Sequence, residues 1–171
     1  ADKHFDQTYY DQGLDSIEAR YASLVEGMDK SLGDIMHWLD QKGIASNTII
    51  MFLSDNGGLS LKPQRAGVAH TQNLPLRAGK GSVYEGGIRI PMLVKWPGKV
   101  SANSIAKQYV IVEDFFPSIL AMAGIKNPKL VQSIDGKSFM PILNNPSLQD
   151  STRSLVWHYP NKWVPNDGPG I

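Results

Sequence analysis

The chain of 171 residues contains no cysteine, which excludes disulfides and thiolate metal sites within it. It also has no apolar run near the roughly 18 residues that a membrane-spanning helix requires. Neither sign of charge is in excess, because 17 Lys and Arg residues stand against 16 Asp and Glu residues. The composition therefore gives no electrostatic reason to expect nucleic acid or an anionic membrane as a partner. What the chain does offer is enough length for one sizeable core.

The first ten residues, ADKHFDQTYY, lack the basic-then-apolar pattern of a signal peptide and contain no initiator methionine. We therefore expect a mature or internal piece of a longer protein.

A helix followed by a strand is the first clear pattern. Apolar residues at steps of three and four predict one helix over residues 17–39, with Gly43 as its C-terminal stop. The repeating positions are Ile17, Tyr21, Leu24, Met28, Leu32, Ile35 and Leu39. Residues 47–54, NTIIMFLS, are apolar without alternation, as in a parallel strand covered on both faces. Together they predict an α/β fold.

The second half of the chain predicts shorter elements. IRIPMLVKW (88–96) is typical of a strand, and residues 112–124 predict a helix with Pro117 in its first turns and Gly124 just beyond its end. SFMPIL (138–143) predicts a short helix. SLVWHY (154–159) predicts a strand that opens a second subdomain, after a domain boundary near residue 145.

Asp55 and Asn56 directly follow the strand at 47–54. The carboxyl end of a strand in an α/β sheet is where ligand and metal sites usually lie. A carboxylate and an amide oxygen are hard ligands suited to calcium, magnesium or manganese. An ordinary DNGG turn, in which the side chains cap their own backbone, is the alternative interpretation, and spacing alone leaves both open.

Lys80 lies between Gly79 and Gly81, in a long Gly- and Pro-rich stretch. Flanking glycines let the backbone approach a ligand closely, so the ammonium group could act as a point charge for a sulfuryl or phosphoryl oxygen. The spacing does not fit the GxxxxGK[ST] phosphate loop. A solvated lysine in a glycine-rich loop is the alternative.

Three stretches in this order carry a resemblance: YASLVEGMDKSLGDI, SDNGG and LRAGKGSVYEGGIRIPMLVKWPG. From about Tyr21 to Leu143 the chain resembles the type I sulfatases of the alkaline-phosphatase-like superfamily. The resemblance implies a mostly parallel sheet flanked by helices and a sulfuric ester hydrolase acting on sulfated carbohydrate. It also implies an exported, periplasmic or extracellular location.

The resemblance assigns roles to individual residues. Asp55 and Asn56 match two calcium ligands of the family, and Lys80 matches the lysine that contacts the sulfate group. Glu85 and Arg89 match the EGGxRxP signature, for which we expect a structural ion pair in a partly buried network.

Other charged side chains receive weaker assignments. His70 precedes Lys80 in the long loop and is a candidate substrate contact. Arg77 adds positive charge to the same loop or is solvated. His37 lies off the apolar stripe of its helix and is given no role. His158 lies near the end of the predicted strand at 154–159, where packing is expected and a substrate contact is the alternative.

The departures from the family are as informative as the matches. The chain has neither the CxPxR nor the SxPxR motif from which the family makes its formylglycine nucleophile, and it lacks the early acidic pair of metal ligands. We therefore expect residues 1–145 to be part of a sulfatase catalytic domain and residues 146–171 to be a linker and the start of a C-terminal subdomain. We expect the nucleophile to lie outside this chain, and the chain alone to be inactive and to associate through exposed sheet edges.

Two other functions remain open at this level. One is a phosphoester or phosphonate hydrolase of the same superfamily, whose members often hold two transition metals through additional Asp and His ligands. The other is a non-catalytic, sulfatase-like module that binds an anion.

Overall fold

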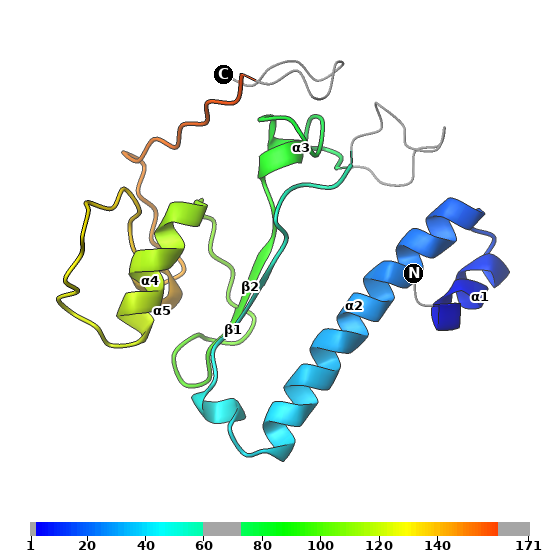
Figure 1. The fold of residues 1–171 in the computed structure, drawn as a ribbon, viewed down its shortest axis with the longest axis horizontal. Helices are drawn as coiled ribbons and strands as arrows, with labels where there is room; N and C mark the ends of the chain where they lie inside the picture. Colours follow the sequence, from blue (N-terminus) through cyan, green and yellow to red (C-terminus); the bar gives the residue numbers. More distant parts are fainter. Residues whose placement is uncertain (1–2, 60–72, 161–171) are drawn as a thin grey trace. The chain divides into compact units, whose positions relative to one another are not determined.

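The computed structural model describes residues 3–59 and 73–160 (Figure 1). The elements in this part of the chain are α1 (Lys3–Asp11), α2 (Ser16–Gln41), the 3-10 turn η1 (Ala45–Asn47), β1 (Ile50–Leu53), α3 (Glu85–Ile88), β2 (Met92–Lys95), the 3-10 turn η3 (Val112–Asp114), α4 (Phe115–Met122) and α5 (Met140–Asn144). They form two compact units, one containing residues 1–94 and 157–171 and the other residues 95–156. Each unit is described by itself.

The long helix predicted from the apolar repeat is α2, and it is confirmed with a few residues added at each end. It begins after Asp15, whose carboxylate accepts hydrogen bonds from the backbone N–H groups of Ile17 and Glu18 at 2.8 and 3.0 Å. It ends at Gln41 and is followed by Gly43, whose φ of +67° is the left-handed conformation that glycine adopts readily.

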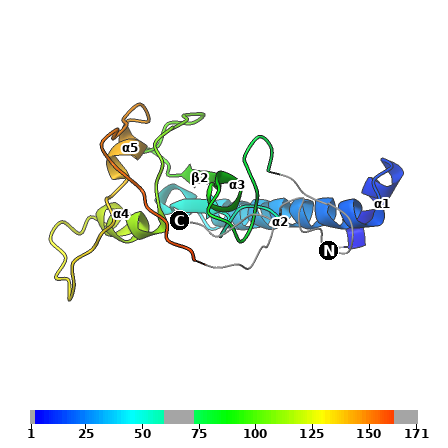
Figure 2. The same ribbon diagram turned by 90° about the horizontal axis from the view of Figure 1, so that it is seen from above.

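A first helix, α1, was not predicted from the sequence. Gly13, with φ of +85°, reverses the chain after it, and the N–H of Leu14 donates to the carbonyl of Tyr9 at 3.1 Å. Figures 1 and 2 show α1 turned back beside the beginning of α2, and contacts between the two helices are extensive. Because α1 is only nine residues long, packing against α2 rather than intrinsic propensity must stabilise it.

The apolar stripe of α2 is only partly covered in this chain. Ala19 and Leu39 are buried, but Leu24, Met28 and Ile35 are each about half exposed, at 54, 48 and 55%. A helix face of this kind normally packs on a sheet or another helix. The face is therefore wider than the surface that the described part of the chain supplies to cover it.

The two predicted strands form, but they are shorter than expected. β1 and β2 have four residues each and pair in a two-stranded sheet. Figure 1 shows the chain running along β1 and returning along β2, so the two strands run in opposite directions, unlike the parallel pairing expected for β1. Mostly parallel sheets often include one such pair. The arrangement places the loop after β1 beside the loop before β2.

The second unit is organised around α4 and α5. The helix predicted over residues 112–124 is η3 followed by α4, with Pro117 in the first turn, and Gly124, at φ +77°, follows its end as predicted. The short helix predicted at 138–143 is α5. The ring of Phe139, only 2% exposed, meets Phe115 edge-on at 5.3 Å between ring centres. These aromatic rings form the small core of this unit.

The strand predicted over residues 154–159 is wrong. These residues are irregular except for an isolated bridge at Tyr159, and Val156 is 81% exposed. No strand of the described residues pairs along this segment, and apolar residues alone do not make a strand without a partner. The domain boundary near residue 145 stays a prediction. No helix of the described residues is long and apolar enough to cross a membrane.

Candidate functional site

Three glycine-containing segments meet at the carboxyl end of β1. The N–H of Gly57 donates to the carbonyl of Gly87 at 2.9 Å, and the N–H of Lys80 donates to the carbonyl of Gly58 at 2.8 Å. The SDNGG, GKG and EGG segments are therefore joined through their main chains rather than their side chains.

The glycines at this meeting point leave no room for a side chain. A Cβ atom on Gly57 would lie 1.8 Å from the carbonyl oxygen of Gly86, and one on Gly86 would lie 2.1 Å from that of Ala78. A Cβ on Gly87 would lie 2.2 Å from the carbonyl oxygen of Ser82. Because each obstacle is backbone, only glycine permits the approach.

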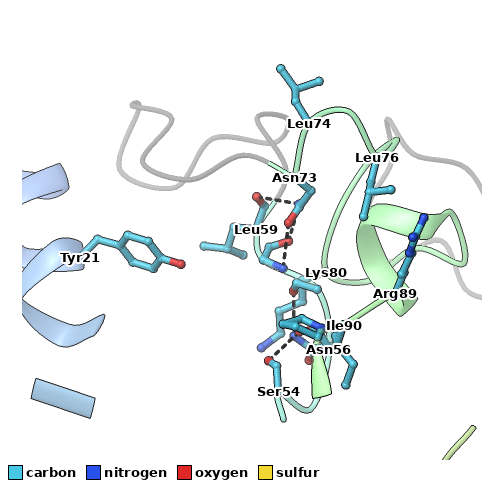
Figure 3. A pocket seen from close by; sticks show the side chains of 13 residues that line it. Tyr21, Ser54, Asn56, Leu59, Asn73, Leu74, Leu76, Lys80, Arg89 and Ile90 are labelled. Atoms are coloured by element: carbon cyan, nitrogen blue, oxygen red, sulfur yellow. Dashed lines mark hydrogen bonds between the residues drawn. The ribbon is translucent and has the colours of Figure 1, made fainter. Parts of the chain in front are cut away.

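We call the meeting point of the SDNGG, GKG and EGG segments the glycine junction. A pocket of about 460 Å³ opens beside it (Figure 3). Its polar side chains are Tyr21, Ser54, Asn56, Asn73, Lys80 and Arg89, and its apolar side chains are Leu59, Leu74, Leu76, Ile90 and Pro91. Tyr21 extends from α2, while the other side chains come from the loops around β1 and α3. A pocket with an ammonium group and amide groups beside an apolar wall suits an anionic group attached to a larger organic body.

Asn56 and Lys80, both predicted from the sequence, line this same pocket. Lys80 is exposed, and Asn56 is half-buried with its amide nitrogen donating to the carbonyl of Gly57 at 2.9 Å. Asp55 is exposed beside them and is not among the residues that line the pocket. His70 lies outside the described residues.

The donors at this site fit part of a calcium shell. The Asp55 carboxylate offers oxygen, and because the Asn56 nitrogen is engaged by Gly57, its amide group presents oxygen as the ligand atom. Calcium takes six to eight oxygens, so two adjacent side chains supply a fraction of what it needs. Within residues 3–59 and 73–160, no three His, Asp or Glu side chains gather as a metal site.

The pair expected between Glu85 and Arg89 forms, at 3.0 Å between Oε2 and Nη1. The expected burial is wrong, because the two side chains are about half exposed, at 53 and 48%. Glu85 begins α3 and Arg89 follows its last residue, so the pair joins positions i and i+4. An exposed pair of this kind contributes little to stability.

The remaining charged candidates lie apart from the pocket. Arg77 stacks on the ring of Tyr84, with Cζ 3.8 Å from the ring centre, so it is held by an aromatic face rather than solvated alone. His37 is exposed on α2 and shares a 2.8 Å hydrogen bond with Gln41. His158 is exposed in the irregular segment after the second unit.

Sequence reasoning gave no site role to four polar residues of the pocket: Tyr21, Ser54, Asn73 and Arg89. The Ser54 hydroxyl donates to the carbonyl of Asn56 at 2.8 Å and so shapes the turn that follows β1. Ser54 was within reach, since it begins the SDNGG motif. Asn73 gives no such signal, because its partners lie as far as 15 residues away in the sequence.

Comparisons with known proteins agree on one family. The sequence model of the family described as Sulfatase matches residues 2–125. A protein named sulfatase from Formosa agariphila is 38% identical over 154 residues, covering 84% of this chain and 26% of its own. Human N-acetylgalactosamine-6-sulfatase is 36% identical over 136 residues, covering 79% of this chain and 25% of its own. The chain thus spans about a quarter of the length of these relatives.

Solved structures give the same answer for the fold. The protein Ps i-CgsB, solved in complex with k-i-k-neocarrahexaose, matches 84% of this chain and 30% of its own, with a TM-score of 0.71 and 34% identity. Another protein, solved with its substrate D-glucosamine-2-N,6-O-disulfate, matches 80% of this chain and 24% of its own, with a TM-score of 0.61 and 26% identity. The family match covers more than half of the chain and includes every segment of the glycine junction, so this chain belongs to the sulfatase family.

Proposed function

We propose that the protein to which this chain belongs hydrolyses sulfate esters of carbohydrates, and that this chain supplies the wall that holds the sulfate group. The observation that carries the proposal is the meeting of Asn56 and Lys80 in one pocket at the end of β1. Lys80 comes from a loop 24 positions later in the sequence, so their convergence is a property of the fold and not of chain proximity.

The chemistry follows from where charge lies in a sulfate ester. Its oxygens carry negative charge, and the Lys80 ammonium group at the pocket binds and orients one of them. Asp55 and Asn56 would hold calcium, which when bound supplies further positive charge beside the same group. The formylglycine nucleophile would come from a segment outside this chain.

The sulfated carbohydrate is the preferred substrate class for two reasons. Polar and apolar side chains line the pocket together, which suits a sugar with its mixed surface. Two of the similar solved proteins are named with carbohydrate ligands, neocarrahexaose and a disulfated glucosamine. An exported, periplasmic or extracellular location is part of the proposal, since polymeric sulfated sugars are met outside the cytoplasm.

The first test compares two esters on the complete protein. Nitrophenyl sulfate should be hydrolysed faster than nitrophenyl phosphate, and Lys80→Ala should lower kcat/KM for the sulfate by about a hundredfold, as for other preorganised electrostatic contacts. Lys126→Ala, an exposed lysine in the other unit, is the matched control and should leave the rate unchanged. Faster cleavage of the phosphate ester would favour a phosphoester hydrolase, and cleavage of neither would favour an anion-binding module.

The metal assignment has its own test. Titration calorimetry of the complete protein with calcium should show a large loss of affinity in Asp55→Asn, because a carboxylate ligand becomes a neutral amide. Asp29→Asn, an exposed acidic residue on α2, is the control for general loss of charge. Equal calcium affinity in wild type and Asp55→Asn would refute the ligand role.

A further inference from the structure

Hydrogen bonds from the side chain of Asn73 link the loop that carries Asn56 to the loop that carries Lys80 (Figure 3). Its Oδ1 accepts a hydrogen bond from the N–H of Gly58 at 3.1 Å, and its Nδ2 donates to the carbonyls of Gly58 and Ala78, each at 3.0 Å. The carbonyl of Leu59 lies within reach of Nδ2 as well, at 3.4 Å. One half-buried amide group thus spans the loop after β1 and the loop that leads to Lys80.

Two of these contacts bear directly on Lys80. The carbonyl of Gly58 that accepts from Asn73 also accepts from the backbone N–H of Lys80. Ala78, two residues before Lys80, has a φ of +60°, a conformation that is costly for a residue with a Cβ and persists only where the surroundings hold it. Asn73 bonds to the carbonyl of this same residue and so stabilises the turn from which Lys80 emerges.

The reach of the Lys80 side chain depends on where its backbone is held. It is long and exposed, and such a side chain has many rotamers, so the position of its backbone sets where the ammonium group can reach. A contact that acts on a transition state is effective only when it is held in place beforehand. The residue that fixes the Lys80 backbone therefore affects how well Lys80 works.

We propose that Asn73 is a positioning residue that holds the Lys80 loop against the loop after β1. The proposal rests on the proposed function of Lys80 as the sulfate-binding group. Both ends of the Asn73 amide are engaged by backbone groups, so the role assigned to Asn73 is to act through Lys80. No other side chain of similar size supplies an acceptor and two N–H donors at once.

Hydrogen exchange on the complete protein tests the structural part without any need for activity. In Asn73→Ala, the backbone amide of Lys80 should exchange about tenfold faster or more, because local opening no longer breaks the Asn73 contacts. Asn127→Ala, an exposed asparagine in the other unit, is the matched control and should not change exchange at Lys80. Unchanged exchange in Asn73→Ala would overturn the proposal.

A double-mutant cycle tests the functional part. Asn73→Ala should lower kcat/KM for nitrophenyl sulfate by about tenfold or more in the wild-type background but by less than about twofold in the Lys80→Ala background, because the effect passes through Lys80. A merely structural residue would cost the same in both backgrounds, and that result would overturn the proposal. If the protein hydrolyses no sulfate ester, the proposed function fails, while the exchange measurement still decides whether Asn73 holds the Lys80 loop.

The isosteric variant Asn73→Asp covers the case in which the alanine variant does not fold. An ionised carboxylate faces the same three carbonyls with no hydrogen to donate, and burial beside them favours its protonated form. Protonation restores one donor, so the activity of this variant relative to wild type should rise as the pH falls. A ratio that stays flat across pH would count against the hydrogen-bonding role.

Discussion

At the scale of single residues, the pocket depends on glycines, because they have no side chain to keep the segments around it apart. Gly57, Gly86 and Gly87 are buried, and each one faces a carbonyl oxygen nearer than any Cβ atom could tolerate. Main chain packs on main chain here, and this close approach brings the segments of Asn56 and Lys80 together. A single methyl group added at one of these glycines should therefore push apart the segments that carry Asn56 and Lys80.

Gly86→Ala tests this directly. The added Cβ would lie 2.1 Å from the carbonyl oxygen of Ala78 and 2.4 Å from that of Arg77, and backbone cannot yield as a flexible side chain can. We expect a loss of about 1–3 kcal/mol in the free energy of unfolding and a fall in kcat/KM for a sulfate ester, measured by urea denaturation and by assay of the complete protein.

Gly33→Ala is the matched control for this substitution. Gly33 lies inside α2, and a Cβ atom added there would meet nothing within 4 Å, so alanine should raise the free energy of unfolding by about 0.5–1 kcal/mol through helix propensity. If both variants shift stability in the same direction, the close approach at Gly86 is not what constrains that position.

The same scale shows what sequence reasoning can reach in the site. A strand end and a glycine-flanked lysine are local patterns that made Asn56 and Lys80 candidates, and the resemblance to the sulfatases assigned their roles. The structure places both in one pocket. Asn73 was missed because its role lies in hydrogen bonds to Gly58 and Ala78, and no local spacing encodes such long-range contacts. The function of Asp55 as a metal ligand stays a prediction.

At the scale of elements, long periodic patterns were predicted better than short apolar ones. The repeat in α2 extends over about seven turns and carries its own cap and stop at Asp15 and Gly43, so local chemistry specifies it. SLVWHY contains apolar residues as β1 does, but it pairs with no strand of the described residues, and strand formation depends on a partner. A helix can therefore be predicted from its own residues, whereas a strand can be predicted only when its pairing partner is known.

The second unit is held by an element-to-element contact that the sequence did not suggest. Asp114, at the end of η3, is fully buried. Its carboxylate accepts a hydrogen bond from each of the two terminal guanidinium nitrogens of Arg153, at 2.6 and 2.7 Å. The backbone N–H groups of Lys137 and Ile111 also donate to it, at 2.8 and 3.0 Å. A carboxylate so completely satisfied joins η3, the turn before α5 and the segment after it.

This contact predicts a dependence of stability on pH. Burial raises the pKa of Asp114, but the hydrogen bonds from Arg153, Ile111 and Lys137 outweigh it, so the pKa lies below its ordinary value of 3.8. A lowered folded-state pKa stabilises the fold above the unfolded-state pKa, and this contribution is lost as the pH falls through the folded-state value.

Asp114→Asn should accordingly lose about 3–5 kcal/mol in the free energy of unfolding at pH 7, because it leaves Arg153 without a countercharge. The difference from wild type should begin to shrink below about pH 4, where the carboxylate of the unfolded state takes up a proton, and should shrink further as the pH falls through the lower folded-state pKa. Urea denaturation of the complete protein at several pH values measures this. Asp34→Asn, which breaks an exposed pair with Lys30, should cost less than about 1 kcal/mol, and an equal effect of both variants would contradict the special role of Asp114.

At the scale of the whole molecule, the main feature is apolar surface that the described residues do not cover. Leu24, Val25, Met28, Ile35 and Trp38 of α2 are 44 to 55% exposed, and the described sheet has only two strands. The chain spans about a quarter of its relatives, in which other segments are available to cover such a face. Contiguous apolar surface of this kind promotes association in water.

We therefore expect the 171-residue chain alone to bind a hydrophobic dye strongly, to form oligomers and to hydrolyse no aryl sulfate. We expect calcium binding to be weak at best, because the two predicted ligands, Asp55 and Asn56, are a fraction of the shell that calcium needs. Light scattering, dye fluorescence and an aryl sulfate assay on this chain beside the complete protein measure these properties. Turnover by the chain alone comparable to that of the complete protein would show that its own residues suffice for catalysis.

The glycine junction also determines how such a protein can be altered by mutation over time. The junction is made of packed backbone, so substitutions of its glycines are sterically blocked. Four apolar residues line the pocket with side chains that can change size without moving this backbone: Leu59, Leu74, Leu76 and Ile90. Under the proposed function, binding of the sulfate group and choice of the sugar attached to it would thus depend on separate residues. Replacing these four apolar residues would then be the route by which selection, natural or in the laboratory, redirects the protein to new esters without changing the proposed anion site.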